Sequence, residues 1–234
     1  MLLMNYQAVI FDLFGTLTGN YPLQQSTSTL AEMATVLSLP SWEFISLWTV
    51  ETWPMRATGK FTDLASCIEY IGRLLDVQLC AEKVKAAAQL WHIFAQDLLN
   101  PRPHAIETLQ ALKNSGYKIG LISDCSAEVQ LCWQNTLFAR TLDVSILSCE
   151  VGLKKPDPRI YQLACNHLKV LPQHCLYVGD GSSHELTGAS QIGMHPILIR
   201  VPDEEKSDAL RPDLEDWHGP AIDTLKDVLT LLEL

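Results

Sequence analysis

Apolar residues along the chain form two patterns, short continuous runs and longer segments with helical spacing. Continuous runs rich in Val, Ile and Leu, each ending in small or polar residues, are typical of strands that are buried on both faces of a parallel sheet. The runs predict five strands, over residues 8–13, 117–123, 144–148, 175–179 and 195–200.

Helical spacing of apolar residues marks segments among these runs. It extends over 105–116, which ends at a glycine, over 158–170, which begins with a proline, and over the shorter stretch 185–193. Alternation of strands and helices implies right-handed crossovers. The pattern therefore predicts an α/β fold, with a Rossmann-like, doubly wound parallel sheet as its core.

The segment from 21 to 99 has a different pattern, because it contains no strand-like run bounded by turns. We interpret it as an inserted all-helical domain that directly follows the first strand. The remaining residues, 1–20 and 100–234, would form the Rossmann-like core. Four helical stretches are expected in the insert, over 28–39, 41–53, 63–75 and 81–99, with breaks at Pro40, 54–61 and 76–80.

The C-terminal part of the chain carries two further predictions. Residues 201–219 are rich in Pro, Asp and Glu and are expected to form a surface loop. Residues 221–234 have helical spacing and predict a final helix.

Composition narrows the class of partner. The formal net charge is −10 over 234 residues, which argues against a nucleic-acid partner because phosphate backbones require basic patches. No run of apolar residues is long enough to predict a membrane span. Seven cysteines without a CxxC pair, and a start without a basic leader, predict reduced thiols in a cytoplasmic protein. No particular oligomeric state is indicated.

Polar residues follow the predicted strands, at the edge where open parallel sheets bind their ligands. These residues are distant in sequence, but the carboxyl ends of parallel strands lie at one rim of the sheet. We therefore expect the groups after the first, second, third and fourth strands to converge there: Asp12 and Thr16, then Ser123 and Asp124, then Lys154 and Lys155, then Asp180 and Glu185.

Four stretches of these strand ends match one protein family. They are FDLFGTL at 11–17, LISDCS at 121–126, VGLKKPDPRIY at 151–161 and YVGDGSSHELTGA at 177–189. In this order and spacing, the chain resembles the haloacid dehalogenase-like hydrolase superfamily, whose members are mostly phosphatases. The resemblance covers 1–20 and 100–200, and the helical insert is similar to the first type of cap domain in that family.

The residues themselves suggest a phosphoryl-transfer site. A carboxylate at a strand end can attack phosphorus, and Asp12 fits that role. Two anions must then approach each other, so a cation is required between them. Mg²⁺ accepts carboxylates and backbone carbonyls, which Asp12, Asp180 and the carbonyl of Phe14 could provide. The expected substrate is a small phosphorylated metabolite.

Supporting roles fall to the other strand-end groups. Ser123 and the amides near Asp124 could donate hydrogen bonds to phosphoryl oxygens, and Thr16 is a further candidate for substrate binding. A lysine would offset the charge that develops on the phosphoryl group. The resemblance to the family assigns this role to Lys155 and not to the adjacent Lys154. Glu185 would hold either Lys155 or a metal-bound water, and we count it in the metal site.

The helical insert offers two cations and four tryptophans. Arg56 and Lys60 are the only cations between residues 13 and 72, which makes them candidates for substrate binding; the alternative is that each is an exposed solubilising charge. Tryptophans in an amphipathic helix are expected to pack in the core of the insert rather than to form a substrate box. These are Trp42, Trp48, Trp53 and Trp91.

Phe14 departs from the family pattern, in which phosphatases carry a general acid, an aspartate, two residues after the nucleophile. General acid–base catalysis is worth about 10²- to 10⁴-fold, so its loss is large but does not remove the whole acceleration. Four outcomes follow. The protein is a phosphatase for substrates with good leaving groups, or a phosphatase whose acid comes from the cap or the substrate, or a 2-haloacid dehalogenase, or a catalytically weak phosphate-binding protein.

The third outcome meets two objections in the sequence. By the resemblance, the dehalogenases need no Mg²⁺ and lack the metal-binding acidic pair, whereas Asp180 and Glu185 are both present here. They also hold the substrate carboxylate with an early arginine, and no Lys or Arg occurs from 13 to 55. A Mg²⁺-dependent phosphatase with Asp12 as nucleophile is the interpretation that these observations favour.

Overall fold

The core of the structure is a parallel sheet of six strands in the order β3-β2-β1-β4-β5-β6. The structure, a computed structural model, describes residues 6–202, 211–214 and 217–234. The strands are β1 (Ala8–Phe11), β2 (Lys118–Ser123), β3 (Val144–Leu147), β4 (Cys175–Gly179), β5 (His195–Ile199) and β6 (Ala221–Ile222). The five predicted strands and the Rossmann-like sheet are confirmed.

Both faces of the sheet are covered, as the continuous apolar runs require. Along β1, Val9 and Phe11 pack into one core while Ala8 and Ile10 pack into the other. The first core lies under α6 (Ala105–Asn114), α7 (Ala127–Trp133), α8 (Leu137–Thr141) and α12 (Asp227–Leu231). The second lies under α10 (Pro158–Leu168) and α11 (Glu185–Gln191), while the short α9 (Ser148–Val151) follows β3 directly.

The strand order places a crevice beside β1. The chain proceeds from β1 to β2 and β3 on one side, and returns to β4 on the other side of β1. Such a reversal of strand order opens a crevice beyond the carboxyl ends of the strands. Asp12 follows β1 and Asp180 follows β4, so both acidic residues lie at this switch point.

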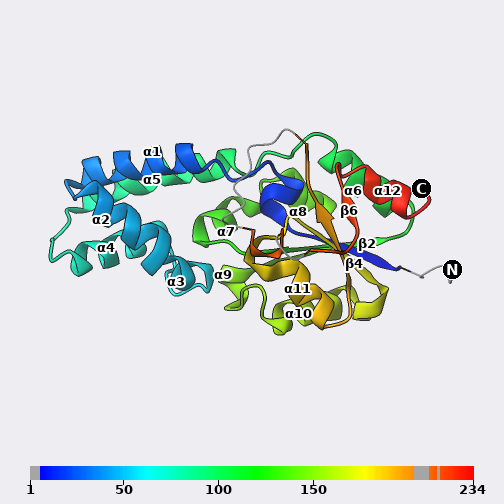
Figure 1. Cartoon of the computed structure of the whole chain (residues 1–234). Coiled ribbons are helices and arrows are strands. Elements are labelled where there is room, and N and C mark those ends of the chain that lie inside the picture. Colours follow the sequence, from blue (N-terminus) through cyan, green and yellow to red (C-terminus); the bar gives the residue numbers. More distant parts are fainter. Residues whose placement is uncertain (1–5, 203–210, 215–216) are drawn as a thin grey trace.

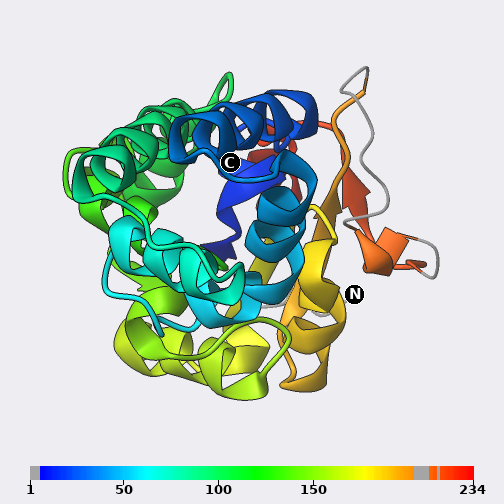
Figure 2. The same cartoon turned by 90° about the vertical axis from the view of Figure 1, so that its left-hand side faces the viewer.

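A helical bundle lies beyond that same end of the sheet (Figures 1 and 2). The helices are α1 (Leu23–Leu37), α2 (Ser41–Ser46), α3 (Trp53–Ala57), α4 (Leu64–Leu74) and α5 (Ala81–Asp97). Four of them, α1, α2, α4 and α5, share a hydrophobic core of their own, separate from the two cores that flank the sheet. Phe44, Trp48 and Trp91 are buried in it, whereas Trp42 is 79% exposed.

The bundle differs from its prediction in two places. The expected break over 54–61 begins with a helical turn, because Pro54 stands in the first turn of α3, where a missing N–H costs nothing. Trp42 does not pack in the core, although its neighbour Phe44 does. In addition, α7, α8 and α9 were not predicted, because helices of four to seven residues give too little periodicity to detect.

The predicted helix over 221–234 is wrong at its start. Ala221 and Ile222 form β6 instead, and pair in parallel with Leu198 and Ile199 of β5. The open edge of β5 offers backbone hydrogen bonds that override the local helical preference. The helix begins only at Asp227, whose carboxylate accepts a hydrogen bond from the backbone N–H of Thr224.

The predicted surface loop over 201–219 is only partly described, since residues 203–210 and 215–216 lie outside the described residues. Within the described part, Asp213 is buried and accepts hydrogen bonds from the backbone N–H of Leu186 and the hydroxyl of Thr187, at the start of α11. This piece therefore packs on the core and supports α11. None of the described helices has the length and apolar character that crossing a bilayer requires.

Candidate active site

A buried lysine connects two carboxylates at the centre of the crevice. The Nζ atom of Lys155 lies 2.5 Å from Oδ1 of Asp12 and 2.6 Å from Oε2 of Glu185. All three side chains are almost fully buried. Residues 12, 155 and 185 thus converge as their strand-end positions predicted. Of the adjacent lysines 154 and 155, only the second is buried among the acids.

The carboxylate of Glu185 accepts hydrogen bonds from three donors, the first of which is Lys155. Its Oε2 also accepts a hydrogen bond from the hydroxyl of Tyr177 at 2.9 Å, and its Oε1 accepts one from the backbone N–H of Gly181 at 3.1 Å. Burial, and then the charge of Asp12, raise the pKa of Glu185 well above its usual value. With both oxygens engaged, this carboxylate is built to fix Lys155.

The charges of its neighbours keep Lys155 protonated. Burial alone would lower the pKa of this lysine, but the charges of Asp12 and Glu185 raise it well above the ordinary value. The backbone N–H of Lys155 also donates to Oδ1 of Asp124 at 2.9 Å. Lys155 is therefore a fixed positive charge beside the first strand end.

Asp12 keeps one oxygen available for chemistry. Its Oδ2 is buried and has no hydrogen-bond partner among the described residues. Burial raises the pKa of Asp12 to about 6; Lys155 lowers this pKa and the charge of Asp180 raises it. The free oxygen belongs to a carboxylate that is desolvated and fixed on its other side, which are the features of an activated nucleophile.

Asp180 is paired with an arginine that the sequence did not indicate. Its Oδ2 lies 2.7 Å from Nε of Arg211, and its Oδ1 accepts a hydrogen bond from the backbone N–H of Ser182. Arg211 also donates to the side chain of Asn20. Gly15 approaches Asp180 so closely that a Cβ atom there would lie 2.2 Å from Oδ2, and its φ of +78° also requires glycine.

An arginine that is distant in sequence holds the loop after β1 by hydrogen bonds. Arg102 is buried and donates from Nε to the carbonyl of Thr18, and from Nη2 to the carbonyl of Gly15. Phe14 lines the pocket in this loop, and its ring meets that of Tyr21 edge to face, with 6.5 Å between centroids. The loop is therefore rigid around Asp12, with an aromatic ring where phosphatases carry an acid.

The oxygen ligands here fit Mg²⁺. One carboxylate oxygen each from Asp12, Asp180 and Glu185 lies within 4.8 Å of the others, and all three residues are buried. Oδ2 of Asp12 is buried and accepts no hydrogen bond from any described residue. Three carboxylates face two cations, Lys155 and Arg211, so the cluster retains negative charge before any anionic substrate arrives. A hard divalent cation matches both the oxygen atoms and the charge.

Three other predicted residues have different surroundings. Asp124 lines the pocket, and its Oδ2 has no hydrogen-bond partner among the described residues. Ser123 and Thr16 are fully buried, and their hydroxyl oxygens accept or donate no hydrogen bond among those residues. Neither lies among the residues that line the pocket. The structure thus places Asp124 at the pocket surface, and Ser123 and Thr16 behind it.

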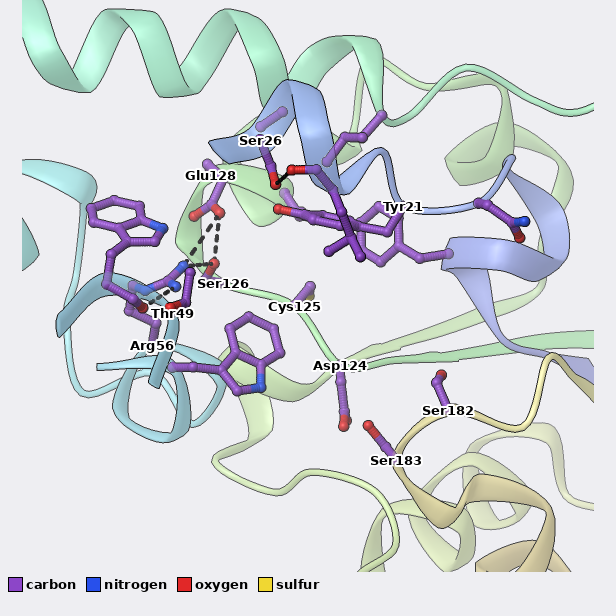
Figure 3. A pocket seen from close by; sticks show the side chains of 18 of the residues that line it. Tyr21, Ser26, Thr49, Arg56, Asp124, Cys125, Ser126, Glu128, Ser182 and Ser183 are labelled. Atoms are coloured by element: carbon purple, nitrogen blue, oxygen red, sulfur yellow. Dashed lines mark hydrogen bonds and ion pairs between the residues drawn. The ribbon is translucent and has the colours of Figure 1, made fainter. Parts of the chain in front are cut away.

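The pocket lies between the sheet and the helical bundle and has a volume of about 360 Å³. Asp12 and Asp180 at the ends of β1 and β4, and Lys155 in the loop between α9 and α10, form one side of it. Figure 3 shows Asp124, Ser182 and Ser183 toward one end, and Arg56, Ser126 and Glu128 together toward the other. Apolar and aromatic residues make up much of the rest, among them Tyr21, Leu30, Trp48, Trp53, Trp91, Leu98 and Val129.

The two candidate cations of the insert have opposite placements. Arg56 is 6% exposed, lines the pocket, and lies over the rings of Trp48 and Trp53. Lys60 is exposed and is not one of the residues that line this pocket, so the structure does not bring it together with the other predicted site residues. Arg56 belongs to α3, whereas Lys60 follows Gly59 beyond the end of that helix. The tryptophans at 48, 53 and 91 also line the pocket. From the sequence we expected them only to pack in the core of the insert.

Four residues around the site were missed by sequence reasoning. Tyr177 lies inside a strand, and Arg102, Glu128 and Arg211 lie outside the four family-like stretches or beside them. Their roles depend on tertiary contacts that no local pattern encodes. For Arg102 the sequence does contain a signal, because Pro101 and Pro103 on either side of it predict a rigid segment where the chain returns to the core.

Known proteins that are similar to this chain include both phosphatases and dehalogenases. Glyceraldehyde 3-phosphate phosphatase of Methanopyrus kandleri is 31% identical over 153 residues, which are 62% of this chain and 65% of that protein. (S)-2-haloacid dehalogenase 1 of Pseudomonas sp. strain CBS-3 is 26% identical over 203 residues, 82% of this chain and 84% of that protein. A crystal structure of a HAD phosphatase from Thermococcus onnurineus shares the fold, with a TM-score of 0.67, 24% identity and 97% of both chains covered.

This chain aligns with only part of the length of several curated relatives. The aligned regions span 65% and 59% of the lengths of the glyceraldehyde 3-phosphate phosphatases of Methanopyrus kandleri and Methanothermobacter thermautotrophicus, and 44% of the length of (S)-2-haloacid dehalogenase 4A of Burkholderia cepacia. A family model, by contrast, covers most of this chain: that of the haloacid dehalogenase-like hydrolases matches residues 6–193. Together with the sheet order and the strand-end cluster, this match shows that the chain belongs to the haloacid dehalogenase-like hydrolases.

Proposed function

We propose that this hydrolase is a Mg²⁺-dependent phosphatase that acts on a small phosphorylated metabolite through an aspartyl-phosphate at Asp12. The observation that carries the proposal is the buried group of Asp12, Asp180 and Glu185, which each have a carboxylate oxygen within 4.8 Å of the others. In this proposal Asp12 and Asp180 hold the metal ion, and Glu185 fixes Lys155 beside it. A metal-free attack on carbon has no use for Asp180 beside the nucleophile, since that charge raises the pKa of Asp12. Attack on a phosphoryl group has such a use, because it requires a cation between the two anions.

In the first step, Oδ2 of Asp12 attacks phosphorus, and the bond from phosphorus to the leaving oxygen breaks. Lys155 keeps Oδ1 occupied, so the free oxygen is the one that reacts. Mg²⁺, held by Asp12, Asp180 and the Phe14 carbonyl, would neutralise charge on the phosphoryl group. In the second step, water attacks phosphorus, phosphate leaves, and the Asp12 carboxylate is restored.

Phe14 sets a preference among leaving groups. An aromatic ring cannot protonate the departing oxygen, so the reaction favours acyl phosphates, phosphoanhydrides and aryl phosphates, whose leaving groups are stable as anions. The helical bundle acts as a cap domain over residues 21–99 in this proposal, and its side chains in the pocket contact the leaving group. Both the metabolite and the cap assignment rest on the pocket between bundle and sheet.

Metal removal tests the proposal directly. We expect phosphate release from acetyl phosphate and p-nitrophenyl phosphate to fall by roughly 10²-fold or more with EDTA and to return with Mg²⁺, because the cation offsets several kcal/mol of charge repulsion. Mg²⁺ should also raise the midpoint of thermal unfolding in the absence of substrate. Phosphate release that is unchanged by EDTA would contradict the metal-dependent mechanism.

A carboxylate at position 14 should restore part of the missing acid catalysis. We expect Phe14→Asp to speed hydrolysis of alkyl phosphates by about 10²-fold and that of acetyl phosphate much less, since only the alkyl leaving group needs a proton. The measurement is kcat/KM for both substrates. Phe14→Leu is the matched control, because it removes the ring without adding a carboxylate. Equal acceleration of both substrates by Phe14→Asp would refute this account of Phe14.

A second candidate function is the hydrolysis of 2-haloacids, and two observations favour it. Phe14 gives the pocket an aromatic wall beside Asp12, and the Pseudomonas dehalogenase aligns over 84% of its length. Here Oδ2 of Asp12 would attack carbon and expel halide. Halide release from 2-chloropropionate in the presence of EDTA distinguishes this candidate from the phosphatase.

A further inference from the structure

The end of the pocket that the cap and core share carries a buried carboxylate with an unused oxygen. Glu128 is 5% exposed and lines the pocket. Its Oε1 accepts hydrogen bonds from the hydroxyl of Ser126 at 2.6 Å and from Nε1 of Trp91 at 3.0 Å. Its Oε2 is buried and has no partner among the described residues. A buried carboxylate oxygen without a donor costs free energy, so a ligand that supplies one gains affinity.

The neighbouring arginine already uses three of its five N–H donors within the protein. Each of the three nitrogens of Arg56 is engaged: Nη1 with Ser126, Nη2 with the backbone carbonyl of Trp48, and Nε with the hydroxyl of Thr52. Its Nη1 also lies 4.0 Å from Oε1 of Glu128, so the two charges offset each other. A second anionic group on the substrate would therefore meet the carboxylate of Glu128 without a free cation to compensate.

An unpartnered donor belongs to the same cluster of rings. Trp48 is 1% exposed and lines the pocket, and its Nε1 has no acceptor among the described residues. Its ring packs against that of Trp91, which holds Glu128, with 5.0 Å between the ring centroids. A single hydroxyl can donate to a carboxylate and accept from an indole N–H, so it is the smallest neutral group that could serve both.

The apolar lining of the rest of the pocket favours a substrate with an apolar body. Side chains that line it include Tyr21, Leu30, Trp53, Leu98 and Val129. A cavity of about 360 Å³ is larger than a three-carbon phosphate requires, so a longer or aromatic skeleton is needed to displace its water.

We propose that the natural substrates are aryl phosphomonoesters, which keep the good leaving group that Phe14 requires, and that the far end of their apolar body carries a neutral hydroxyl. The hydroxyl donates its proton to Oε2 of Glu128 and accepts from Nε1 of Trp48. This inference rests on the proposed phosphatase function and adds to it the chemistry of the leaving group. Phosphomonoesters that carry a second phosphate or a carboxylate at that end are poor substrates.

The same subsite links substrate recognition to the cap. Arg56 of α3 and Trp91 of α5 belong to the helical bundle, whereas Ser126 and Glu128 belong to the core at the start of α7. Their hydrogen bonds cross from bundle to core. A hydroxyl bound between Glu128 and Trp48 adds one more connection across this boundary, so the correct substrate stabilises the contact between bundle and core.

Three aryl phosphates that differ only in the para group test the inference, and the first two of these groups are matched in size. They carry 2-hydroxyethyl, propyl or 2-carboxyethyl groups para to the phosphate, and phenol leaving groups need little protonation. We expect kcat/KM for the hydroxyethyl compound to exceed that for the propyl compound by about 10- to 100-fold, as one hydrogen bond to a charged acceptor supplies. The carboxyethyl compound should be the poorest. Binding is followed separately by quenching of the fluorescence of the pocket tryptophans.

The Glu128→Gln variant should bring the ratio of hydroxyethyl to propyl compound to within about threefold of one, because an amide replaces the charged acceptor and a neutral hydrogen bond contributes less. Glu43→Gln, on an exposed position of the bundle, is the matched control and should keep the wild-type ratio. Equal kcat/KM for all three compounds in the wild type would overturn the inference while the phosphatase function stands. No turnover, with hydroxyl-selective quenching that Glu128→Gln removes, would overturn the phosphatase and leave the subsite.

Discussion

Asp12→Asn should lower turnover of p-nitrophenyl phosphate and acetyl phosphate by about 10⁴-fold or more, the size of loss that follows removal of a catalytic nucleophile. The amide has nearly the same shape as the carboxylate and can still accept a hydrogen bond from Lys155, so the pocket keeps its geometry. What disappears is the negative charge on Oδ2, the one oxygen of Asp12 that no described residue occupies. The effect should therefore fall on kcat, with little change in substrate binding.

The measurement is a single-turnover experiment with rapid acid quench, in which the wild type should accumulate phosphoryl-enzyme and the variant should not. Asp97→Asn, the same substitution at an exposed position of α5, is the control and should retain both turnover and the intermediate. Equal rates for Asp12→Asn and the wild type would remove Asp12 from the mechanism, and with it every role assigned here to Lys155 and Asp180.

The sequence predicted the sheet well because a buried parallel strand leaves a local signature. Each of the five main strands lies inside a continuous apolar run, and the polar residue that ends the run marks the rim. β6 left no such signature: two residues, Ala221 and Ile222, become a strand only because β5 has an open edge. Short elements that depend on a neighbour are where local reasoning fails.

The candidate site divides in the same way. Asp12, Lys155 and Asp180 could be predicted, since each directly follows a strand or lies in a stretch that the family shares. Arg211 could not, because it reaches Asp180 from a segment whose Pro, Asp and Glu content indicates a loop. Glu128 could not either. A glutamate in the first turn of a helix is usually solvated, and only the packing of Trp91 against α7 buries it.

Arg56 and Lys60 show the limit most directly, because they are four residues apart and equivalent as charges in the sequence. The turn of α3 directs Arg56 toward Trp48 and Ser126, whereas Lys60, after Gly59, is exposed. One cation therefore belongs to the pocket and the other to the surface. The difference comes from where a five-residue helix ends, which sequence patterns do not resolve.

Lys155→Met should lower the free energy of unfolding by about 3–5 kcal/mol, because it leaves Asp12 and Glu185 buried without their shared cation. For a chain of this size, the midpoint of thermal unfolding should fall by roughly 10 °C. Methionine fills much of the lysine volume, so the loss reflects charge more than packing. Thermal and urea unfolding, followed by circular dichroism, measure the change.

A second substitution separates the charge effect from a general loss of packing. Glu185→Gln removes one of the two stranded carboxylates and keeps an acceptor for Tyr177, so Lys155→Met combined with Glu185→Gln should be more stable than Lys155→Met alone. Lys154→Met, at the half-exposed neighbouring lysine, should change stability by no more than about 0.5 kcal/mol. If the two lysine variants lost equal stability, or if the losses in the double variant simply added, Lys155 would not be the charge that holds Asp12 and Glu185 together.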